Sequence, residues 1–209
     1  MIITVDGPAA AGKGTLARQL ADHLNLALLD TGLIYRAVGM NLVHSGADIN
    51  DAVPAIKAAQ NLKPEDLEAK DLRTDEAAEA ASRISIFPEV RTALLHFQRA
   101  FATNPPGSSF GAILDGRDIG TVVCPEAKIK FFVTARPEVR AERRYLELRN
   151  RGLDAIYGRV LDDLKARDAR DSARTVSPLV PAEDAFLLDT SDLTVDEVFS
   201  RALDFINEN

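Results

Sequence analysis

The sequence predicts an α/β fold of the P-loop type, in which a parallel sheet of five strands lies between layers of helices. Five short apolar runs each end in Asp or Thr before a loop, as strands that are buried on both faces of a parallel sheet do. Helical patterns alternate with these runs, as a layered α/β fold requires. A glycine-rich segment that contains a lysine, Gly7–Thr15, follows the first run and precedes a helical pattern.

The elements follow in order along the chain. The runs that we interpret as strands are Ile2–Asp6, Ala27–Asp30, Ala112–Asp115, Ile129–Thr134 and Ala185–Asp189. Pro137 followed by Glu138 is typical of a helix start after the fourth strand. Thr194–Glu197 has the pattern of a capping box for the last helix. In that helix we expect Val198, Ala202 and Phe205 to face inward.

Two long stretches do not fit the sheet. The first runs from Thr31 to about Pro105; it is helical, and it is polar in its middle, residues 48–79. Its later part predicts an amphipathic helix, because apolar residues follow 4-3-4 spacing at Val90, Leu94, Phe97 and Phe101. The second runs from about Tyr145 to Pro181 and is dense in Arg and Asp. Both follow strands, at the edge of the sheet where ligands bind in such folds.

Composition excludes several classes of protein. With 209 residues, 46% of them hydrophobic, the chain can form one large domain or a core with inserted parts. The net charge of −7 argues against a nucleic-acid groove, which needs a basic excess. A single cysteine, Cys124, excludes an internal disulfide and a cysteine-based zinc site. Neither a signal-peptide pattern nor a long apolar stretch is seen, so we expect a cytoplasmic protein with no membrane partner.

The segment after the first strand is the strongest functional signal. Strand, glycine-rich turn and helix are the context of a phosphate-binding loop, whose N–H groups and helix N-terminus hold an anion. The lysine between two glycines would place its charge on the β- and γ-phosphates. The hydroxyl comes one position later than in the general pattern, which resembles nucleoside monophosphate kinases, so we expect Mg²⁺ to be held mainly by ATP phosphates and water. The residues of this predicted ATP-binding loop are Gly7, Pro8, Ala9, Ala10, Ala11, Gly12, Lys13, Gly14 and Thr15.

Two further loops carry charged residues at strand ends. After the second strand, Gly32 permits a tight turn and Arg36 begins a helix beside it; an ordinary helix start with a solvated arginine is the alternative. Asp115 ends the third strand, where P-loop proteins keep an acid near Mg²⁺. Arg117 and Asp118 then protrude from the carboxyl edge of the sheet, although an ion pair in a loop is usually structural.

A fourth group lies on one predicted helix face, because its members follow 4-3-4-3 spacing. The members are Val160, Leu164, Arg167, Asp171 and Arg174. The first two can pack, and the last three place two guanidinium groups about a carboxylate. A self-satisfied salt-bridge ladder on the surface is the alternative. Before this helix we expect most arginines to be solvated and one or two to reach the transferring phosphate; these are Arg140, Arg143, Arg144, Arg149 and Arg151.

Together these loops resemble those of the bacterial cytidylate kinases, which phosphorylate CMP and dCMP and have the three-layer, adenylate-kinase-like P-loop fold. The resemblance follows nearly the whole chain in order. The matching stretches are residues 6–15, 29–36, 87–91, 115–125 and 167–189. It implies transfer of the γ-phosphoryl of Mg·ATP to the 5′-phosphate of CMP or dCMP, in pyrimidine nucleotide metabolism.

The resemblance also implies a role for each matching residue. The implied catalytic residues are Lys13, Arg117 and Arg174. The residues matched to recognition of the cytosine edge are Ser82, Arg91 and Asp118. Those matched to the clamp on the acceptor phosphate are Arg36, Arg117 and Arg174. Those matched to the sugar are Arg167 and Asp171, and those that line the same pocket are Thr31 and Tyr35.

One departure from the resemblance concerns an insert. Many members carry a β-rich insert in the monophosphate-binding region, whereas residues 53–79 here are short, polar and helix-like. We therefore expect that insert to be reduced or absent. The implied organisation is one P-loop kinase domain, residues 1–209, with an inserted monophosphate-binding part, residues 31–105, and an inserted lid, residues 145–178.

Two other functions stay open on the sequence. One is a nucleoside monophosphate kinase with UMP or AMP as acceptor, and the other is a P-loop protein that only senses nucleotide. The arginine-rich second site favours an enzyme, because a sensor needs only one phosphate site. As partners we expect ATP and CMP or dCMP, with no nucleic acid, and we expect a monomer.

Overall fold

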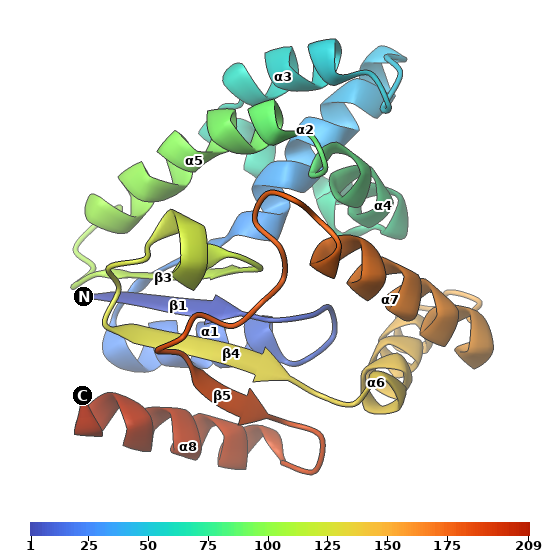
Figure 1. Ribbon diagram of the computed structural model, residues 1–209. Helices are drawn as coiled ribbons and strands as arrows, with labels where there is room; N and C mark the ends of the chain where they lie inside the picture. Colours follow the sequence, from blue (N-terminus) through green and yellow to red (C-terminus); the bar gives the residue numbers. More distant parts are fainter. The chain divides into compact units, whose positions relative to one another are not determined.

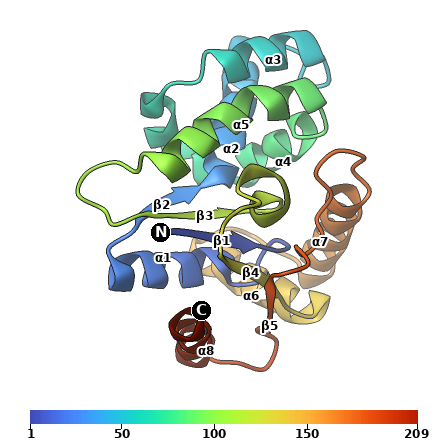
Figure 2. The ribbon, with the colours of Figure 1, turned by 60° about the vertical axis from the view of Figure 1, so that its left-hand side comes forward.

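The computed structural model describes the backbone of residues 1–209 and every side chain except that of Pro64. The chain divides into two compact units, one of residues 1–28 and 105–209 and the other of residues 29–104. The first unit holds most of the parallel sheet, and the second is helical (Figures 1 and 2).

The sheet has the strand order β2-β3-β1-β4-β5. The strands are β1 (Ile2–Asp6), β2 (Ala27–Asp30), β3 (Ala112–Gly116), β4 (Ile129–Thr134) and β5 (Phe186–Asp189). The bounds of each strand lie within one residue of the predicted range, so the predicted five-stranded α/β fold is confirmed. β1 pairs in parallel with β3 and β4, and the register places Asp6 between Gly116 and Phe132. The carboxyl ends of these three strands therefore meet at one edge of the sheet.

Four α-helices belong to the first unit, and the first and last of them along the chain share an apolar core with the sheet. Ile3 and Val5 of β1 and Phe131 of β4 are fully buried, in one cluster with Leu16 and Leu20. The helices are α1 (Lys13–Leu24), α6 (Pro137–Asn150), α7 (Tyr157–Ser172) and α8 (Val195–Glu208). α6 begins at the predicted proline, and α6 and α7 pack on each other through a separate small cluster.

The last helix begins with the predicted capping box. The Thr194 N–H donates to Glu197 Oε2 over 2.8 Å, and Thr194 Oγ1 accepts from the Glu197 N–H over 3.3 Å. Val198 and Ala202 are buried, as predicted, and Phe205 is half-buried at the edge of the core. The capping pattern and the inward face were both readable from local spacing.

Helices also make up the second unit, and its core is separate. They are α2 (Thr31–Ser45), α3 (Ala52–Gln60), α4 (Asp75–Ile84) and α5 (Pro88–Thr103), with the 3-10 turns η1 (Pro64–Glu68) and η2 (Lys70–Arg73). Val90 and Leu94 are buried with Ile34 of α2, which confirms the predicted amphipathic helix. α2 and α4 approach closely at Gly39, where a Cβ atom would lie 2.8 Å from the Cβ of Ala80.

Between residues 53 and 79, the residues that the structure describes form no strand. This stretch holds most of α3, then η1 and η2, and the start of α4. The prediction that the β-rich insert is reduced or absent is therefore confirmed. Among the described residues, no helix combines the length and the apolar composition that crossing a membrane requires.

The predicted turn at Gly32 is wrong. α2 begins directly after β2, with Asp30 as its N-cap residue in an extended conformation, so Gly32 and Arg36 both lie inside the helix. A Cβ atom on Gly32 would lie 3.0 Å from Asp30 Oδ1. The glycine therefore makes room for a carboxylate at the helix N-terminus, where negative charge is favourable, and does not bend the chain.

The predicted helix face is also too long. α7 ends at Ser172, so Arg174 follows the helix and is not part of it. The chain then folds back, and the Leu179 N–H donates to the carbonyl oxygen of Asp171 over 3.0 Å. Spacing alone does not show where a helix ends, because the same residues stay close in a compact turn.

Candidate active site

The loop between β1 and α1 has a backbone that glycine makes possible. Gly7 has φ +142° and Gly12 φ +98°, a region that residues with a Cβ atom rarely adopt. A Cβ atom on Gly7 would lie 1.9 Å from the carbonyl oxygen of Val133. Ala10 also has a positive φ, +59°, which costs about 1 kcal/mol. Gly12 is the N-cap of α1, so the unpaired N–H groups of the helix start adjoin the loop.

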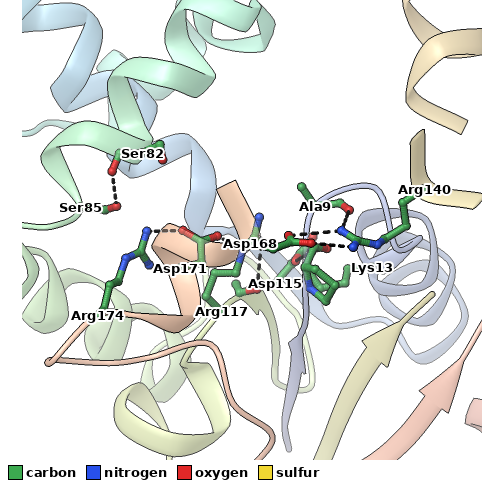
Figure 3. Close-up of polar contacts among 12 residues, drawn as sticks. Ala9, Lys13, Ser82, Ser85, Asp115, Arg117, Arg140, Asp168, Asp171 and Arg174 are labelled. Atoms are coloured by element: carbon green, nitrogen blue, oxygen red, sulfur yellow. Dashed lines mark hydrogen bonds and ion pairs between the residues drawn. The ribbon is translucent and has the colours of Figure 1, made fainter. Parts of the chain in front are cut away.

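Lys13 is held inside this loop (Figure 3). Its side chain is 7% exposed; its ammonium donates to the carbonyl oxygen of Pro8 over 2.9 Å and lies 3.9 Å from Asp115 Oδ1. A Cβ atom on Gly14 would lie 3.3 Å from Asp115 Oδ2. The glycine after the lysine therefore allows the carboxylate at the end of β3 to approach the start of α1. A buried cation, a carboxylate and helix N–H groups together suit a polyanion with a metal counter-ion.

Asp6 connects the end of β1 to the start of a short helical turn, η3 (Ile119–Val123), which follows β3 and Asp118. Its Oδ1 accepts from the Ile119 N–H over 2.8 Å, and its Oδ2 accepts from the Gly120 N–H over 2.7 Å. Burial, together with the negative charges of Asp118 and Asp115, raises the pKa of Asp6 to about 7, although the two N–H donors oppose the rise. Asp6 thereby positions the backbone next to Asp118.

Asp171 of α7 is the centre of an arginine cluster. It is 2% exposed; its Oδ2 accepts from Arg117 Nε over 3.1 Å and its Oδ1 accepts from Arg174 Nη2 (Figure 3). Burial would raise the pKa of Asp171, but the positive charges of Arg117, Arg174 and Arg167 outweigh it and hold that pKa below its ordinary value. Asp171 is therefore ionised at neutral pH and can accept hydrogen bonds.

The pairing within this cluster differs in part from the prediction. The two guanidinium groups expected about Asp171 were those of Arg167 and Arg174, but Arg117 and Arg174 are the two that hydrogen-bond its carboxylate. Arg167 acts on Asp171 through its charge. Arg117 comes from the loop after β3 and also donates to the carbonyl oxygen of Gly116 over 3.1 Å, a contact that helical spacing could not reveal.

In the second unit lie two of the residues that the resemblance matched to cytosine, Ser82 of α4 and Arg91 of α5, and one matched to the pocket lining, Tyr35 of α2. The guanidinium carbon of Arg91 lies 5.6 Å from the ring centre of Tyr35, and Arg91 Nη1 donates to the carbonyl oxygen of Ser85 over 3.4 Å. Ser85 Oγ in turn donates to the carbonyl oxygen of Ser82 over 2.9 Å. Ser82 is buried, and within the described residues its Oγ has no hydrogen-bond partner. A buried hydroxyl beside an arginine suits a polar ligand edge.

Arg36 and Thr31 occupy α2 in the same unit. Arg36 Nη1 donates to the carbonyl oxygens of Leu72 over 2.7 Å and Thr74 over 3.3 Å. Thr31 is buried in the first turn of the helix. The predicted site residues are thus divided between the two units: Lys13, Arg117, Asp118, Arg167, Asp171 and Arg174 belong to the first, and Thr31, Tyr35, Arg36, Ser82 and Arg91 to the second.

Sequence reasoning missed several residues that support the loop. Arg140, which we expected to be solvated or bound to phosphate, is buried, and it contacts Ala9 of the loop and Asp168 of α7. Thr190, after β5, contacts the carbonyl oxygen of Ala11. The one available signal for Asp6 was its place at the end of the first strand, directly before the loop. Nothing local signalled the other contacts, because they join segments far apart in the chain.

The chain is similar to known proteins over nearly its full length. The cytidylate kinase family model matches residues 3–208. A cytidylate kinase of Paramagnetospirillum magneticum is 62% identical over 205 residues, 98% of this chain and 97% of that protein. A cytidylate kinase of Rhodospirillum rubrum is 56% identical over 206 residues, 99% of this chain and 97% of that protein.

The fold has a counterpart among solved structures. A crystal structure of an uncharacterized protein from Eubacterium ventriosum covers 100% of this chain and 99% of its own, with a TM-score of 0.59 and 14% identity. At that identity the likeness concerns the fold alone.

Proposed function

Because the chain belongs to the cytidylate kinase family, we propose that its two groups of site residues are the donor and acceptor halves of that family's reaction. The chain is an ATP-dependent (d)CMP kinase: it transfers the γ-phosphoryl of ATP to CMP or dCMP and releases ADP and CDP or dCDP. Acceptance of UMP or AMP as main substrate, and a purely nucleotide-sensing role, are not favoured by relatives of this identity.

The donor half consists of Gly7–Thr15. The N–H groups of the loop and of the first turn of α1 surround the ATP phosphates, and Lys13 places its charge on the β- and γ-phosphates. The observation that supports this is the buried ammonium of Lys13 between the Pro8 carbonyl and Asp115. We infer that a nucleotide phosphate would replace these two groups as partners of Lys13.

The residues present fit a magnesium ion that is held mainly by ATP phosphates and water. The carboxylate of Asp115 stands 3.9 Å from the Lys13 ammonium, and Thr15 lies in the first turn of α1. Among the described residues, no group of three or more His, Cys, Asp or Glu side chains could hold a metal alone. When bound, Mg²⁺ neutralises phosphate charge and orients the γ-phosphoryl.

The acceptor half recognises the cytosine base and binds the phosphate of CMP or dCMP. Ser82, Arg91 and Asp118 recognise the cytosine edge, since a carboxylate accepts from its amino group and an arginine donates to its carbonyl and ring nitrogen. The clamp on the acceptor phosphate consists of Arg36, Arg117 and Arg174. The sugar contacts are Arg167 and Asp171, with Thr31 and Tyr35 lining the pocket. The ionised state of Asp171 supports its role as an acceptor for sugar hydroxyls.

The chemistry needs little more than position and charge. The attacking oxygen of CMP is already anionic, so no strong general base is required, and catalysis rests on alignment and on neutralising the charge of the transferred group. Arginine suits this role because its planar fork grips phosphate through two N–H groups. We further propose that residues 31–105 and 145–178 close over the substrates and exclude water, which would otherwise accept the phosphoryl group.

We also propose a location in the cytoplasm, activity without nucleic acid and a monomeric state. ATP and CMP are cytoplasmic metabolites, which supports a cytoplasmic enzyme. The net charge of −7 supports activity without nucleic acid, and we propose a monomer, which light scattering coupled to size exclusion can test.

The observation that best supports the two-site assignment is the buried Asp171 carboxylate with its arginines, in the same unit as the loop that holds Lys13. The direct test is ADP release with CMP, dCMP, UMP and AMP as acceptors. We expect turnover with CMP and dCMP far above that with AMP. Equal turnover with all four, or none with CMP, would contradict the proposal.

A further inference from the structure

Arg140 of α6 is an arginine whose donors are occupied by the protein itself. Its side chain is 4% exposed; Nε donates to the carbonyl oxygen of Ala135 over 2.9 Å, and Nη1 donates to that of Ala9 over 3.2 Å. Nη1 and Nη2 also form a fork on Asp168, over 3.2 and 2.6 Å (Figure 3). These contacts use four of the five N–H groups of a guanidinium. No fork is left for a phosphate, so Arg140 is not a ligand of the transferred group.

The contact with Ala9 has a consequence for the loop. A peptide unit is planar and trans, so its C=O and the N–H of the next residue point in opposite directions. Because Arg140 binds the carbonyl oxygen of Ala9, the N–H of Ala10 must point away from Arg140. Ala10 keeps a positive φ of +59°, and a conformation of that kind persists only where the surroundings enforce it.

A second contact fixes the orientation of another peptide unit of the loop, two residues further along the chain. Thr190 Oγ1 donates to the carbonyl oxygen of Ala11 over 2.9 Å, which directs the N–H of Gly12. Thr190 is itself held by Arg143, one turn after Arg140 on α6. Arg143 Nη1 donates to Thr190 Oγ1 over 2.9 Å, and its Nη2 donates to the Thr190 carbonyl oxygen over 2.7 Å. One helix, α6, thus supports both peptide units from outside.

We propose that Arg140 and Thr190 are positioning residues that aim the N–H groups of Ala10 and Gly12 at the phosphates of ATP. Asp168 holds the Arg140 fork in the required orientation. The proposal rests on the assignment of Gly7–Thr15 as the ATP loop. For Arg140 alone, it replaces the sequence-based expectation of a solvated or phosphate-binding side chain.

The chain offers a matched control on the same segment. Arg136, directly before α6, forms a fork with Asp192 over 2.7 and 2.6 Å. The two side chains are 53% and 75% exposed, and neither contacts the loop through its side chain in the described residues. R136M therefore removes an arginine–carboxylate ion pair like that of Arg140 and Asp168, but it removes no side-chain contact with the loop.

The experiment compares R140M, R140K, T190V and the control R136M with the wild type. Affinity for MgADP is measured by calorimetry, KM is measured separately for ATP and CMP, and thermal melting reports folding. In R140M and T190V we expect MgADP affinity to fall about tenfold and the KM for ATP to rise similarly, as loss of one aiming hydrogen bond implies. The KM for CMP should stay within about twofold of the wild-type value. R140K can still donate to Ala9 and should fall between R140M and the wild type.

Three outcomes overturn the proposal: a folded R140M with wild-type affinity for MgADP, an equal rise in the KM values for ATP and CMP, or the same loss in R136M. If R140M does not fold, T190V decides, and unchanged MgADP affinity in T190V overturns the proposal. The proposed function fails in a different way, through a wild type that forms no CDP from CMP. A wild type that forms CDP, with variants that bind MgADP equally well, defeats only the positioning role.

Discussion

Asp6→Asn should change how the stability of the protein depends on pH. Burial raises the pKa of Asp6 from 3.8 to about 7, so the native state holds its proton more tightly than the unfolded chain. Its contribution to stability is present in full below pH 3.8 and is lost as the pH rises through about 7. Asparagine at this position does not titrate, so the variant lacks this dependence.

The size of the effect follows from the shift. One pKa unit corresponds to about 1.36 kcal/mol, so the whole shift corresponds to about 4 kcal/mol. Between pH 5 and pH 8, the two states differ in protonation of Asp6 only up to its native pKa of about 7. We therefore expect the free energy of unfolding of the wild type, relative to that of Asp6→Asn, to fall by about 3 kcal/mol over this interval.

The assay is chemical unfolding of both proteins at several pH values from 5 to 8. Taking the difference between the two proteins cancels the titration of all other groups. The exposed Asp22 of α1 provides the control, because Asp22→Asn should keep the pH dependence of the wild type. The reasoning about Asp6 is refuted if the difference between wild type and Asp6→Asn is the same at pH 5 and pH 8.

Four further outcomes are expected. Lys13→Ala should cut turnover by about 10³-fold with the fold intact, and near-normal turnover would contradict the P-loop role. Asp118→Ala should lose the preference for CMP over UMP in the acceptor assay; retained selectivity would remove Asp118 from base recognition. Gly7→Ala should cost more than about 4 kcal/mol, since the new Cβ would lie 1.9 Å from the Val133 oxygen, and a stable variant would disprove that close approach. Asp171→Asn should lower the free energy of unfolding by about 3–5 kcal/mol at pH 7. Because the pKa of Asp171 is lowered, the difference in stability from the wild type should narrow as the pH falls below 3.8, the ordinary pKa of an aspartate. A difference that stays constant with pH would argue against the ion cluster.

Local sequence patterns predicted most of the fold. The five apolar runs, the Pro137 helix start and the capping box at Thr194 all appear where spacing placed them. Each is decided by nearest neighbours along the chain, through strand burial or helix capping. The predictions that were wrong concern how elements join, as at Gly32, where a strand passes directly into a helix.

The candidate site was predictable to the extent that its residues stand in recognisable loops. Two segments indicate phosphate binding by their composition and by their place after strands, namely Gly7–Thr15 and Asp115–Asp118. Which charged side chains meet was not predictable. Asp171 pairs with Arg117, which is distant in sequence, whereas helical spacing pointed to Arg167.

By itself the sequence predicted the P-loop, the succession of strands and helices along the chain, and the residue types of a candidate second site that is rich in arginine. Only the tertiary structure decided that Arg140 serves the loop from outside and that Asp6 holds the neighbouring loop. The physical reason is that periodicity orders residues within one element, while hydrogen bonds between elements depend on how buried backbone groups meet after folding. An arginine that looks like a phosphate ligand in sequence can therefore contact the backbone of the loop instead, as Arg140 does.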